Sequence, residues 1–550
     1  MSYGNSHETL RGMLIESAEK YADRDAFLLN TGQGVFPVKY KKFKSDADAL
    51  ATALLGILNL KNKKIAICAK NSYEWCLSYM AVLSGVGVVV PTDKELSAEE
   101  LSNILNMGGI DAVICDNRSA KKILSVIHSI EKKPILIGCE EREKDSLIPL
   151  KFLLQRGYEL LAQGYTLPSC EQINPDELAV LLFTSGTTGV SKGVMLSNRN
   201  LYSDLKAVTH SVEVNENDVS LSVLPLHHTY EAIAFLMMIY KGGCISFCKG
   251  FRYLVYDFAQ YKPTVFVSVP LILEKIHRRI TKKTQEEGKQ KKIKLLSLVS
   301  AALNDDKRKK IFEEVHALFG GRLRKIIVGA ASLKKNVAED FELFGIPVII
   351  GYGLTECSPI VICNSDNDRT TDSVGKPVTG VEVKIENKDE NGIGEIHVKG
   401  PMVMKGYYKN EDETQRVLKN GWFNTGDLGY IDKSGNYHLT GRSKNIIVTS
   451  TGKNIYPEEL ELMLYRNPTV RECIVYSKQY NVITAEILPD YDEIKLKLKK
   501  DTPTENDVLD ILCEAIRSTN KKLPAYKRIN RFVLRETEFS KTTTHKIKRG

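Results

Sequence analysis

Apolar and polar positions along the first part of the chain predict helices alternating with strands. Leu10, Met13, Leu14 and Ala18 recur at the spacing of one helix face, so an amphipathic helix is expected there. Short apolar runs at 64–69, 86–90 and 112–115 indicate buried strands, with a helix over 75–83 between the first two. SAEE at 97–100 has the spacing of a capping box and predicts the start of another helix, which a glycine at 108 ends. This alternation indicates a parallel α/β sheet.

The second half repeats this pattern and then changes. Ser197 or Asn198 is a candidate helix cap, and strands are expected at 264–269, 295–299 and 325–328. Residues 381–400 alternate apolar with polar, and Asn391-Gly392 predicts the turn of an antiparallel hairpin. Beyond Arg442 we expect a helix opened by Pro457, strands at 473–476 and 482–488, a helix through 508–515 and a strand at 532–534.

The predicted fold class is therefore α/β with two domains. A large N-terminal domain, 1–441, is expected to combine α/β subdomains with a small antiparallel β subdomain. A small mobile α+β domain, 442–550, is expected to follow it. A chain of 550 residues is too long for one compact core, which agrees with this division.

Composition narrows the class of protein only modestly. The hydrophobic fraction of 43% is that of a globular protein, and the net charge of +9 does not argue for nucleic acid over this length. It fits anionic ligands, and it leaves a peripheral membrane contact open. The eleven cysteines are scattered without a CxxC pair, and the first ten residues lack the apolar core of a signal peptide. We therefore expect a cytoplasmic protein with reduced thiols.

A loop rich in glycine and hydroxyl residues is the strongest chemical signal. The sequence TSGTTGVSKG at 184–193 follows an apolar run, and its backbone N–H groups, hydroxyls and Lys192 suit a polyphosphate. It is not a Walker loop, because Ser191 and Gly193 stand where that motif needs glycine and a magnesium-binding hydroxyl. From composition alone, a surface loop between two strands remains the alternative.

Three further segments carry candidate ligands. In GYGLTECSP at 351–359, Tyr352 can stack on a base, Thr355 can bond a phosphate oxygen and Glu356 can hold Mg²⁺. In GWFNTGDLG at 421–429, Asp427 can accept two hydrogen bonds from a ribose diol. The small residues GAAS at 329–332 follow a predicted strand. Each segment taken alone could equally be an ordinary turn.

Together and in this order, the segments resemble the signature motifs of the adenylate-forming superfamily. This superfamily includes acyl-CoA synthetases, luciferases and peptide-synthetase adenylation domains, and the resemblance runs from about residue 6 onward. It implies a nucleotide site made of Thr184, Ser185, Gly186, Thr187, Thr188, Gly189, Lys192, Gly329, Ala330, Ala331, Tyr352, Gly353, Asp427 and Arg442.

The same resemblance implies a catalytic set and a hinge. The catalytic residues would be Lys546, Thr355, Glu356 and His228, with Glu356 as the metal ligand and Lys444 as the hinge. The chain departs from the family pattern at three positions, with Asn445 for a usual Asp, Ser540 for a usual Pro and His545 for a usual Gly. The last two leave a frayed basic tail as the alternative interpretation of 539–550.

The sequence LPLHHTYE at 224–231 resembles long-chain fatty acyl-CoA synthetases within this superfamily. The implied reaction activates a long-chain fatty acid with ATP and Mg²⁺ to acyl-AMP and pyrophosphate. The acyl group then passes to coenzyme A, and AMP leaves. An acyl-carrier-protein synthetase or an aryl or medium-chain acid–CoA ligase would share the first step. A nucleotide-binding homologue without catalysis is the alternative from a different class. The expected partners are fatty acid, ATP and coenzyme A, without nucleic acid, and no oligomeric state is predicted.

Overall fold

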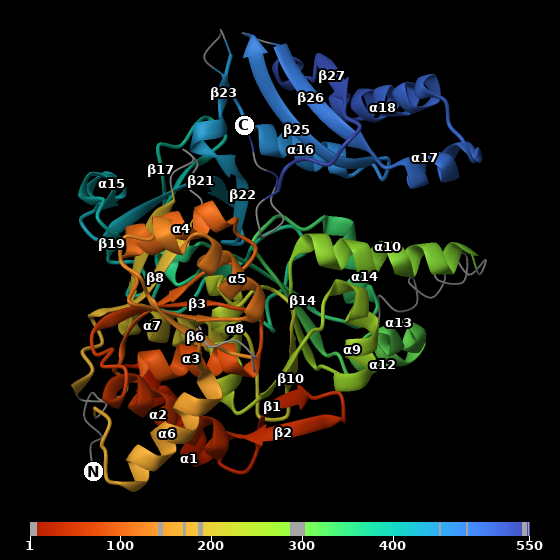
Figure 1. Ribbon diagram of the computed structural model, residues 1–550. Coiled ribbons are helices and arrows are strands. Elements are labelled where there is room, and N and C mark those ends of the chain that lie inside the picture. The colour runs from red at the N-terminus through yellow and green to blue at the C-terminus, as the bar shows by residue number, and fades with distance from the viewer. Residues whose placement is uncertain are drawn as a thin grey trace.

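The computed structural model describes residues 8–140, 147–168, 172–184, 191–286, 303–449, 453–479 and 482–541, together with Ile547 and Arg549 (Figure 1). Two large sheets with their helices, a small antiparallel sheet and a C-terminal unit make up the described part of the chain. The predicted α/β class, with a small antiparallel subdomain and a small C-terminal α+β domain, is confirmed. Within this part, none of the helices is both long and apolar enough to cross a membrane.

The first large sheet has eight strands. In spatial order they are β19 (Gly406–Tyr407), β9 (Lys192–Ser197), β8 (Leu178–Thr184), β4 (Gly87–Pro91), β3 (Lys63–Cys68), β5 (Ala112–Cys115), β6 (Ile135–Gly138) and β7 (Ile148–Pro149). The neighbouring strands β4, β3, β5, β6 and β7 run parallel to one another. The helices of this region are α1 (Leu10–Lys20), α2 (Tyr40–Gly56), α3 (Tyr73–Leu83), α4 (Ala98–Gly108), α5 (Asn117–Ser125), α6 (Leu150–Ala162) and α7 (Asn198–Ser211).

The second large sheet has nine strands and is parallel from β13 through β12, β10 and β11 to β1. In spatial order they are β16 (Lys376–Pro377), β15 (Ile360–Cys363), β14 (Val348–Gly353), β13 (Lys325–Val328), β12 (Val265–Ser268), β10 (Val219–Ser222), β11 (Cys244–Phe247), β1 (Asp25–Asn30) and β2 (Val35–Lys39). Its helices are α8 (Thr229–Lys241), α9 (Leu254–Tyr261), α10 (Pro270–Glu286), α12 (Asp305–Ile311), α13 (Glu313–Leu318) and α14 (Lys335–Leu343).

The small sheet is antiparallel, as the alternation at 381–400 predicts. Its strands are β17 (Glu382–Glu386), β18 (Gly394–Lys399), β20 (Leu418–Lys419), β21 (Trp422–Ile431) and β22 (Tyr437–Arg442), and α15 (Glu411–Val417) precedes β20. The hairpin turn predicted at Asn391-Gly392 is confirmed, because the Gly392 N–H donates to the Asp389 carbonyl at 3.0 Å between the antiparallel strands β17 and β18. Glu386 pairs with Glu395, so the connection is longer than two residues. Asp389 Oδ1 accepts hydrogen bonds from the backbone N–H groups of Asn391 and Ile393, at 2.8 and 3.0 Å, which stabilises this wider loop.

The C-terminal unit has an apolar core of its own, drawn from residues 455–529. Its elements are β23 (Ile447–Val448), β24 (Asn454–Ile455), α16 (Pro457–Tyr465), β25 (Val470–Gln479), β26 (Val482–Pro489), α17 (Tyr491–Leu498), α18 (Glu505–Asn520) and β27 (Arg531–Leu534). Figure 1 shows the strands β25, β26 and β27 with α16 and α18 above the two large sheets.

Most of the helices and strands that the local sequence pattern predicts are confirmed. Ser97 and Glu100 form the predicted capping box of α4, and Ser197 rather than Asn198 caps α7. The strands at 112–115 and 325–328 have the predicted bounds. The strand expected at 295–299 lies outside the described residues.

Candidate functional site

The glycine-rich loop connects two antiparallel strands. β8 ends at Thr184 and β9 begins at Lys192, and these two residues are the last pair of the ladder. Buried Leu181 and Leu182 anchor β8 in the sheet. Ser185, Gly186, Thr187, Thr188 and Gly189 lie outside the described residues. The two ends of the predicted phosphate loop are therefore fixed beside one another by the sheet.

Lys192 has an acidic partner that its own segment does not reveal. Its Nζ lies 2.5 Å from Glu413 Oε1 and 5.2 Å from the centre of the Tyr407 ring. Arg416 Nε is 2.7 Å from the other oxygen of Glu413. The hydrogen bonds from Arg416 and then Lys192 hold the pKa of Glu413 at about 2, so this carboxylate is ionised at neutral pH.

Tyr407 joins Lys192 to Glu356. Its hydroxyl donates to Glu356 Oε1 at 2.8 Å, while its ring lies under the Lys192 ammonium. Glu356 follows β14 in a short 3-10 turn, Thr355–Cys357, which places Thr355 and Glu356 at the end of a central strand. The lysine of the predicted phosphate loop and the predicted metal ligand are thus linked through a single tyrosine side chain.

Asp427 contacts two other predicted site residues, Tyr352 and Arg442. The Tyr352 hydroxyl donates to Asp427 Oδ2 at 2.7 Å, and Arg442 Nε lies 2.6 Å from Oδ1. Tyr352 and Asp427 are buried, while Arg442 is half-buried. Burial, and then the charge of Asp427, raises the pKa of Tyr352 well above its ordinary value, so its hydroxyl stays a donor. β14, β21 and β22 thereby bring a ring, an acceptor and a cation together.

Close neighbours leave little room for a side chain at two glycines of the candidate site. A Cβ at Gly353 would collide with the carbonyl oxygen of Pro359, and a Cβ at Gly329 would lie 3.1 Å from Cζ of Tyr230. Ala330 has φ of 70°, a left-handed conformation that costs an L-residue about 1–2 kcal/mol. Ala331 follows it in the same turn. The loop after β13 is therefore held tightly, with Tyr230 against its first residue.

The segment 224–231 joins this loop to the core. Tyr230 donates to the carbonyl of Ile327 at 3.2 Å, while half-buried His228 caps the start of α8 without a side-chain cap bond. The His227 ring lies 4.2 Å from that of His228, centre to centre. Burial lowers the pKa of His227 to about 3 and raises that of Glu231 to about 8, so both side chains are neutral at pH 7.

The predicted hinge and the C-terminal tail meet at Glu458. Lys444 is exposed in the turn Ser443–Asn445, and Asn445 Nδ2 donates to Glu458 Oε1 at 2.5 Å. Arg549 lies 3.5 Å from the same oxygen and also pairs with Glu461. An aspartate at 445 would place two carboxylates together, so the asparagine that departs from the family pattern suits this partner.

The tail is anchored on both sides of residues 542–546. Lys541 Nζ lies 2.5 Å from Glu472 Oε1, and Arg549 Nη1 donates to the Val475 carbonyl at 3.2 Å. Lys546 and His545 lie outside the described residues. The contacts of Lys541 and Arg549 dock these two residues, one on either side of that stretch, against β25.

The residues fit a nucleotide-bound Mg²⁺ better than a metal held by protein alone. Among the described residues, no group of three or more His, Cys, Asp and Glu side chains could hold a metal ion. Mg²⁺ in nucleotide sites needs only one or two carboxylates, because phosphates and waters complete its octahedron. Glu356, half-buried beside Tyr407, can supply that one carboxylate.

Sequence reasoning missed Tyr407, Glu413, Tyr230 and Glu458 as neighbours of the site. Asn410 and Glu413 have the spacing of a helix start, which the structure has as the cap of α15. That signal predicts a helix but says nothing of Lys192. The other three carry no local signal.

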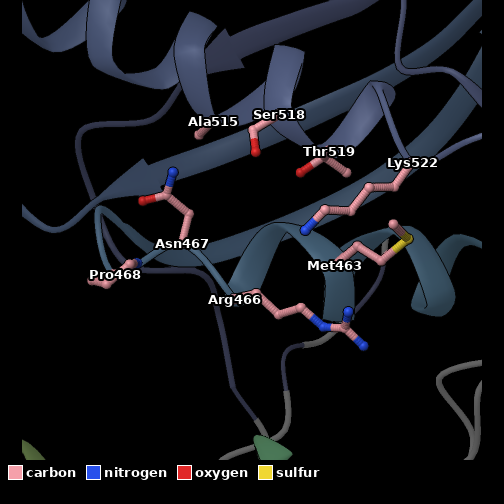
Figure 2. Close-up of a pocket in the computed structure, with 8 residues that line it drawn as sticks. All are labelled: Met463, Arg466, Asn467, Pro468, Ala515, Ser518, Thr519 and Lys522. Carbon is pink, nitrogen blue, oxygen red and sulfur yellow. The ribbon is translucent and has the colours of Figure 1, made fainter. Parts of the chain in front are cut away.

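A separate surface pocket of about 240 Å³ opens between α16 and α18 (Figure 2). It is lined by Met463, Arg466, Asn467, Pro468, Ala515, Ser518, Thr519 and Lys522. None of the predicted site residues that the structure describes borders this pocket, which sets it apart from the Tyr352, Asp427 and Arg442 contacts.

The chain matches known proteins over nearly its full length. A model of the AMP-binding enzymes matches residues 14–408, and one of the AMP-binding enzyme C-terminal domain matches 444–550. The chain is 31% identical to a chloroplastic long-chain-fatty-acid–acyl-carrier-protein ligase of Arabidopsis thaliana, over 87% of this chain and 76% of the relative. It is also 31% identical to long-chain-fatty-acid–CoA ligase 5 of Mus musculus, over 83% and 71%.

Solved structures share the fold. An anthranilate CoA ligase in complex with anthranoyl-AMP superposes with a TM-score of 0.79 at 19% identity, covering 98% of this chain and 95% of that chain. A Mycobacterium tuberculosis fatty acyl CoA synthetase gives 0.67 at 21% identity, covering 99% and 97%. The fold is thus that of these CoA ligases. The chain belongs to the AMP-binding enzyme family, and the predicted family is confirmed.

Proposed function

We propose that the protein is a long-chain fatty acid–CoA ligase that forms AMP. It would convert a fatty acid and ATP to acyl-AMP and pyrophosphate, and then transfer the acyl group to coenzyme A. The observation that carries the proposal is the contact of Tyr352, Asp427 and Arg442, which come from three strands. The names of the relatives at 31% identity support the substrate class.

Asp427 would bind the ribose and Tyr352 the base. In the structure Asp427 accepts from Tyr352 and Arg442, so it already presents both oxygens to donors. A ribose diol can share these oxygens, because a carboxylate has about four lone-pair sites. Gly329, Ala330 and Ala331 would line the base, and Thr184 with the loop 185–189 would surround the phosphates.

Charge neutralisation is the main task of the first step. The substrate carboxylate and the α-phosphate are both anions, so cations between them lower the barrier. Lys192 would bind the leaving phosphates after exchanging Glu413 for them, and Lys546 would lie between the two reactants. Glu356 would hold Mg²⁺, which supplies further positive charge on the phosphates.

The bond changes are simple. A carboxylate oxygen attacks the α-phosphorus, a C–O–P bond forms, and pyrophosphate leaves. The thiol of coenzyme A then loses its proton and attacks the acyl carbon, and AMP leaves as the C–O bond to phosphate breaks. We assign the first step mainly to 1–441 and propose that 442–550 turns about Lys444 between the steps, so that Lys546 withdraws.

The acyl site would begin at the segment 224–231, with His228 at its mouth. An acyl-carrier protein is a second candidate acceptor, because one relative is named as a ligase for that protein. We propose that the protein acts in the cytoplasm and that any membrane contact is peripheral.

Acyl-dependent exchange of labelled pyrophosphate into ATP tests the first step. Exchange should rise with chain length among the shorter fatty acids, since each buried CH₂ contributes about 0.8 kcal/mol. Benzoate or acetate outperforming every fatty acid would refute the substrate class, and no exchange with any acid would support a non-catalytic nucleotide-binding protein. Competition between coenzyme A and holo-acyl-carrier protein then identifies the acceptor.

A further inference from the structure

The side-chain amide of Asn200, near the start of α7, uses both its donor nitrogen and its acceptor oxygen. Its Oδ1 accepts from the Ser197 backbone N–H at 2.8 Å. Its Nδ2 donates to the carbonyls of Pro401 at 2.7 Å and Val403 at 2.9 Å. Asn200 is buried, and a buried donor without a partner would be costly. The amide therefore fastens α7 to a segment that begins 201 positions later in the chain.

The segment that Asn200 holds contacts Glu356 in two ways. The Met404 N–H donates to the Glu356 carbonyl at 2.8 Å, and the Met402 carbonyl accepts from Ser358 Oγ at 2.8 Å. Three residues after Met404, the Tyr407 hydroxyl donates to Glu356 Oε1. We call residues 401–407 the supporting segment. It contacts both the backbone and the carboxylate of the predicted metal ligand.

One turn further along α7, Asp204 holds the other end of the Glu356 turn. Its Oδ1 accepts from the Ile360 N–H at 3.1 Å, and the side chain is buried. Ile360 begins β15, four residues after Glu356. Asn200 and Asp204 are also four residues apart, so they lie on one face of the helix. Because α7 directly follows β9, this helix joins the strand that begins at Lys192 to the predicted metal ligand.

The choice of asparagine at position 200 indicates a task beyond capping α7. Ser197 and Asn200 form a capping box, in which the side chain of the later residue only has to accept a hydrogen bond. The box at the start of α18 uses an acid for this purpose, since Asp507 Oδ2 accepts from the Thr504 N–H at 2.9 Å. An acid would also suit the first turn of a helix. An aspartate at 200 could therefore cap α7, but its carboxylate could not donate to the two carbonyls of the supporting segment.

We propose that Asn200 is a positioning residue for Glu356 and acts through the supporting segment. The inference rests on the proposed function for the role of Glu356 toward nucleotide-bound Mg²⁺. The hydrogen bonds of Asn200 to residues 401–403 do not depend on that role. Removing a group that orients a metal ligand typically lowers metal affinity by about tenfold to hundredfold.

Two variants of the full chain loosen the supporting segment from opposite sides. Asn200→Asp keeps the acceptor of the capping box and removes both donors. Ser358→Ala removes the hydrogen bond to the Met402 carbonyl, and it carries the test alone if Asn200→Asp does not fold. The matched control is Asp507→Asn, the reverse exchange in the capping box of α18. Glu356→Gln serves as the reference for loss of the metal ligand itself, and thermal unfolding checks that each variant folds.

Calorimetric titration with ATP, in Mg²⁺ or in EDTA, measures how much the metal tightens nucleotide binding. We expect Mg²⁺ to lower the Kd for ATP in the wild type and in the control. This gain should fall about tenfold or more in Asn200→Asp and in Glu356→Gln, and it should also fall in Ser358→Ala. The Kd in EDTA should remain that of the wild type, because no metal is then bound.

Hydrogen exchange provides a second measurement that needs neither metal nor nucleotide. The backbone N–H groups of 354–360 and 401–407 should exchange faster in Asn200→Asp and Ser358→Ala than in the wild type, because local opening becomes easier. The control should leave both stretches unchanged. Faster exchange with an unchanged Mg²⁺ gain would overturn the inference, since the segment would then have a purely structural role.

The remaining outcomes separate the inference from the proposed function. Equal loss of the Mg²⁺ gain in Asn200→Asp and Asp507→Asn would overturn the inference. If Glu356→Gln loses the gain while the Asn200 and Ser358 variants keep it, the inference alone is wrong. If the wild type shows no gain, or Glu356→Gln retains it, the proposed metal role of Glu356 fails and the inference fails with it. If the wild type shows the gain but no acyl-dependent exchange, the proposed catalysis fails and the positioning of Glu356 stands.

Discussion

Replacing Asp427 by asparagine perturbs the proposed ribose site with almost no change of shape. The carboxylate accepts from Tyr352 at 2.7 Å and from Arg442 at 2.6 Å, so both oxygens face the site. Asparagine keeps one oxygen, but its amide nitrogen donates and cannot accept from a diol. One hydrogen bond to a charged acceptor is lost, which contributes about 1.5–3 kcal/mol. The expected result is a KM for ATP raised about tenfold to hundredfold, since 1.4 kcal/mol is a factor of ten.

The effect on folding should be smaller than the effect on ATP. The Arg442 side chain is 43% exposed, so water screens its charge once Asp427 is neutral, and the ion pair contributes about 1 kcal/mol or less. Thermal unfolding without nucleotide measures this part, and pyrophosphate exchange over a range of ATP concentrations measures the other. A Tyr352→Phe variant tests whether the ring or the hydroxyl matters, because it keeps the stacking surface.

Asp389→Asn is the matched control. Asp389 also accepts from a tyrosine hydroxyl, that of Tyr456 at 2.8 Å, but it lies in the loop between β17 and β18. We expect its KM for ATP to remain that of the wild type. If the Asp427 and Asp389 variants raise KM equally, or if Asp427→Asn leaves KM unchanged, Asp427 does not bind the ribose.

Five other substitutions, which make up three tests, give distinct expected results. Lys192→Ala should lower pyrophosphate exchange by about tenfold or more, because it removes one charged contact to the phosphates. Glu413→Gln should retain exchange and lower the KM for ATP, because it removes the carboxylate that competes for Lys192. Equal losses of exchange in both variants would refute this competition. Glu231→Gln should raise Tm increasingly between pH 4.5 and about pH 8. Burial raises the folded-state pKa of Glu231 to about 8, so ionisation of the unfolded chain removes stability across that window and no further above it; a pH-independent difference in Tm would contradict this. Lys546→Ala should abolish acyl-AMP formation but still convert supplied acyl-AMP and coenzyme A to thioester. Lys444→Pro should form acyl-AMP but little thioester, because proline fixes φ at the proposed hinge. Loss of both half-reactions in both variants would refute the proposed alternation between two domain arrangements.

Local signals account for what was predicted correctly. The capping box of Ser97 and Glu100 is complete within four residues, and the run at 112–115 is buried at every position, so neither needs distant information. The hairpin turn at Asn391-Gly392 is also a local signal, and the two antiparallel strands do turn there. There the Asp389 side chain bonds two backbone N–H groups and favours a wider loop over the tight one that Asn-Gly prefers.

Contacts between distant segments could not be predicted in the same way. Family resemblance identified Tyr352 and Asp427 separately, but not the hydrogen bond that joins residues 75 positions apart. Glu413 is 221 positions from Lys192, and its spacing from Asn410 predicts a helix start but no contact with that lysine. Its position depends on how α15 packs beside β9 and β19, which is a property of the folded chain.

The surroundings of Glu458 connect the proposed hinge to the last described residues of the chain. Asn445 and Arg549 both contact this carboxylate. A rotation at Lys444 must therefore either break both contacts or move the two segments together with Glu458. The exposed Lys444 lies between Arg442, which contacts Asp427, and Asn445, which contacts the C-terminal unit. A turn of the backbone at this residue would therefore keep Arg442 with the nucleotide and move Glu458 and Arg549 together. Such a division is what a two-step reaction needs, because AMP must stay bound while the groups around the acyl carbon change.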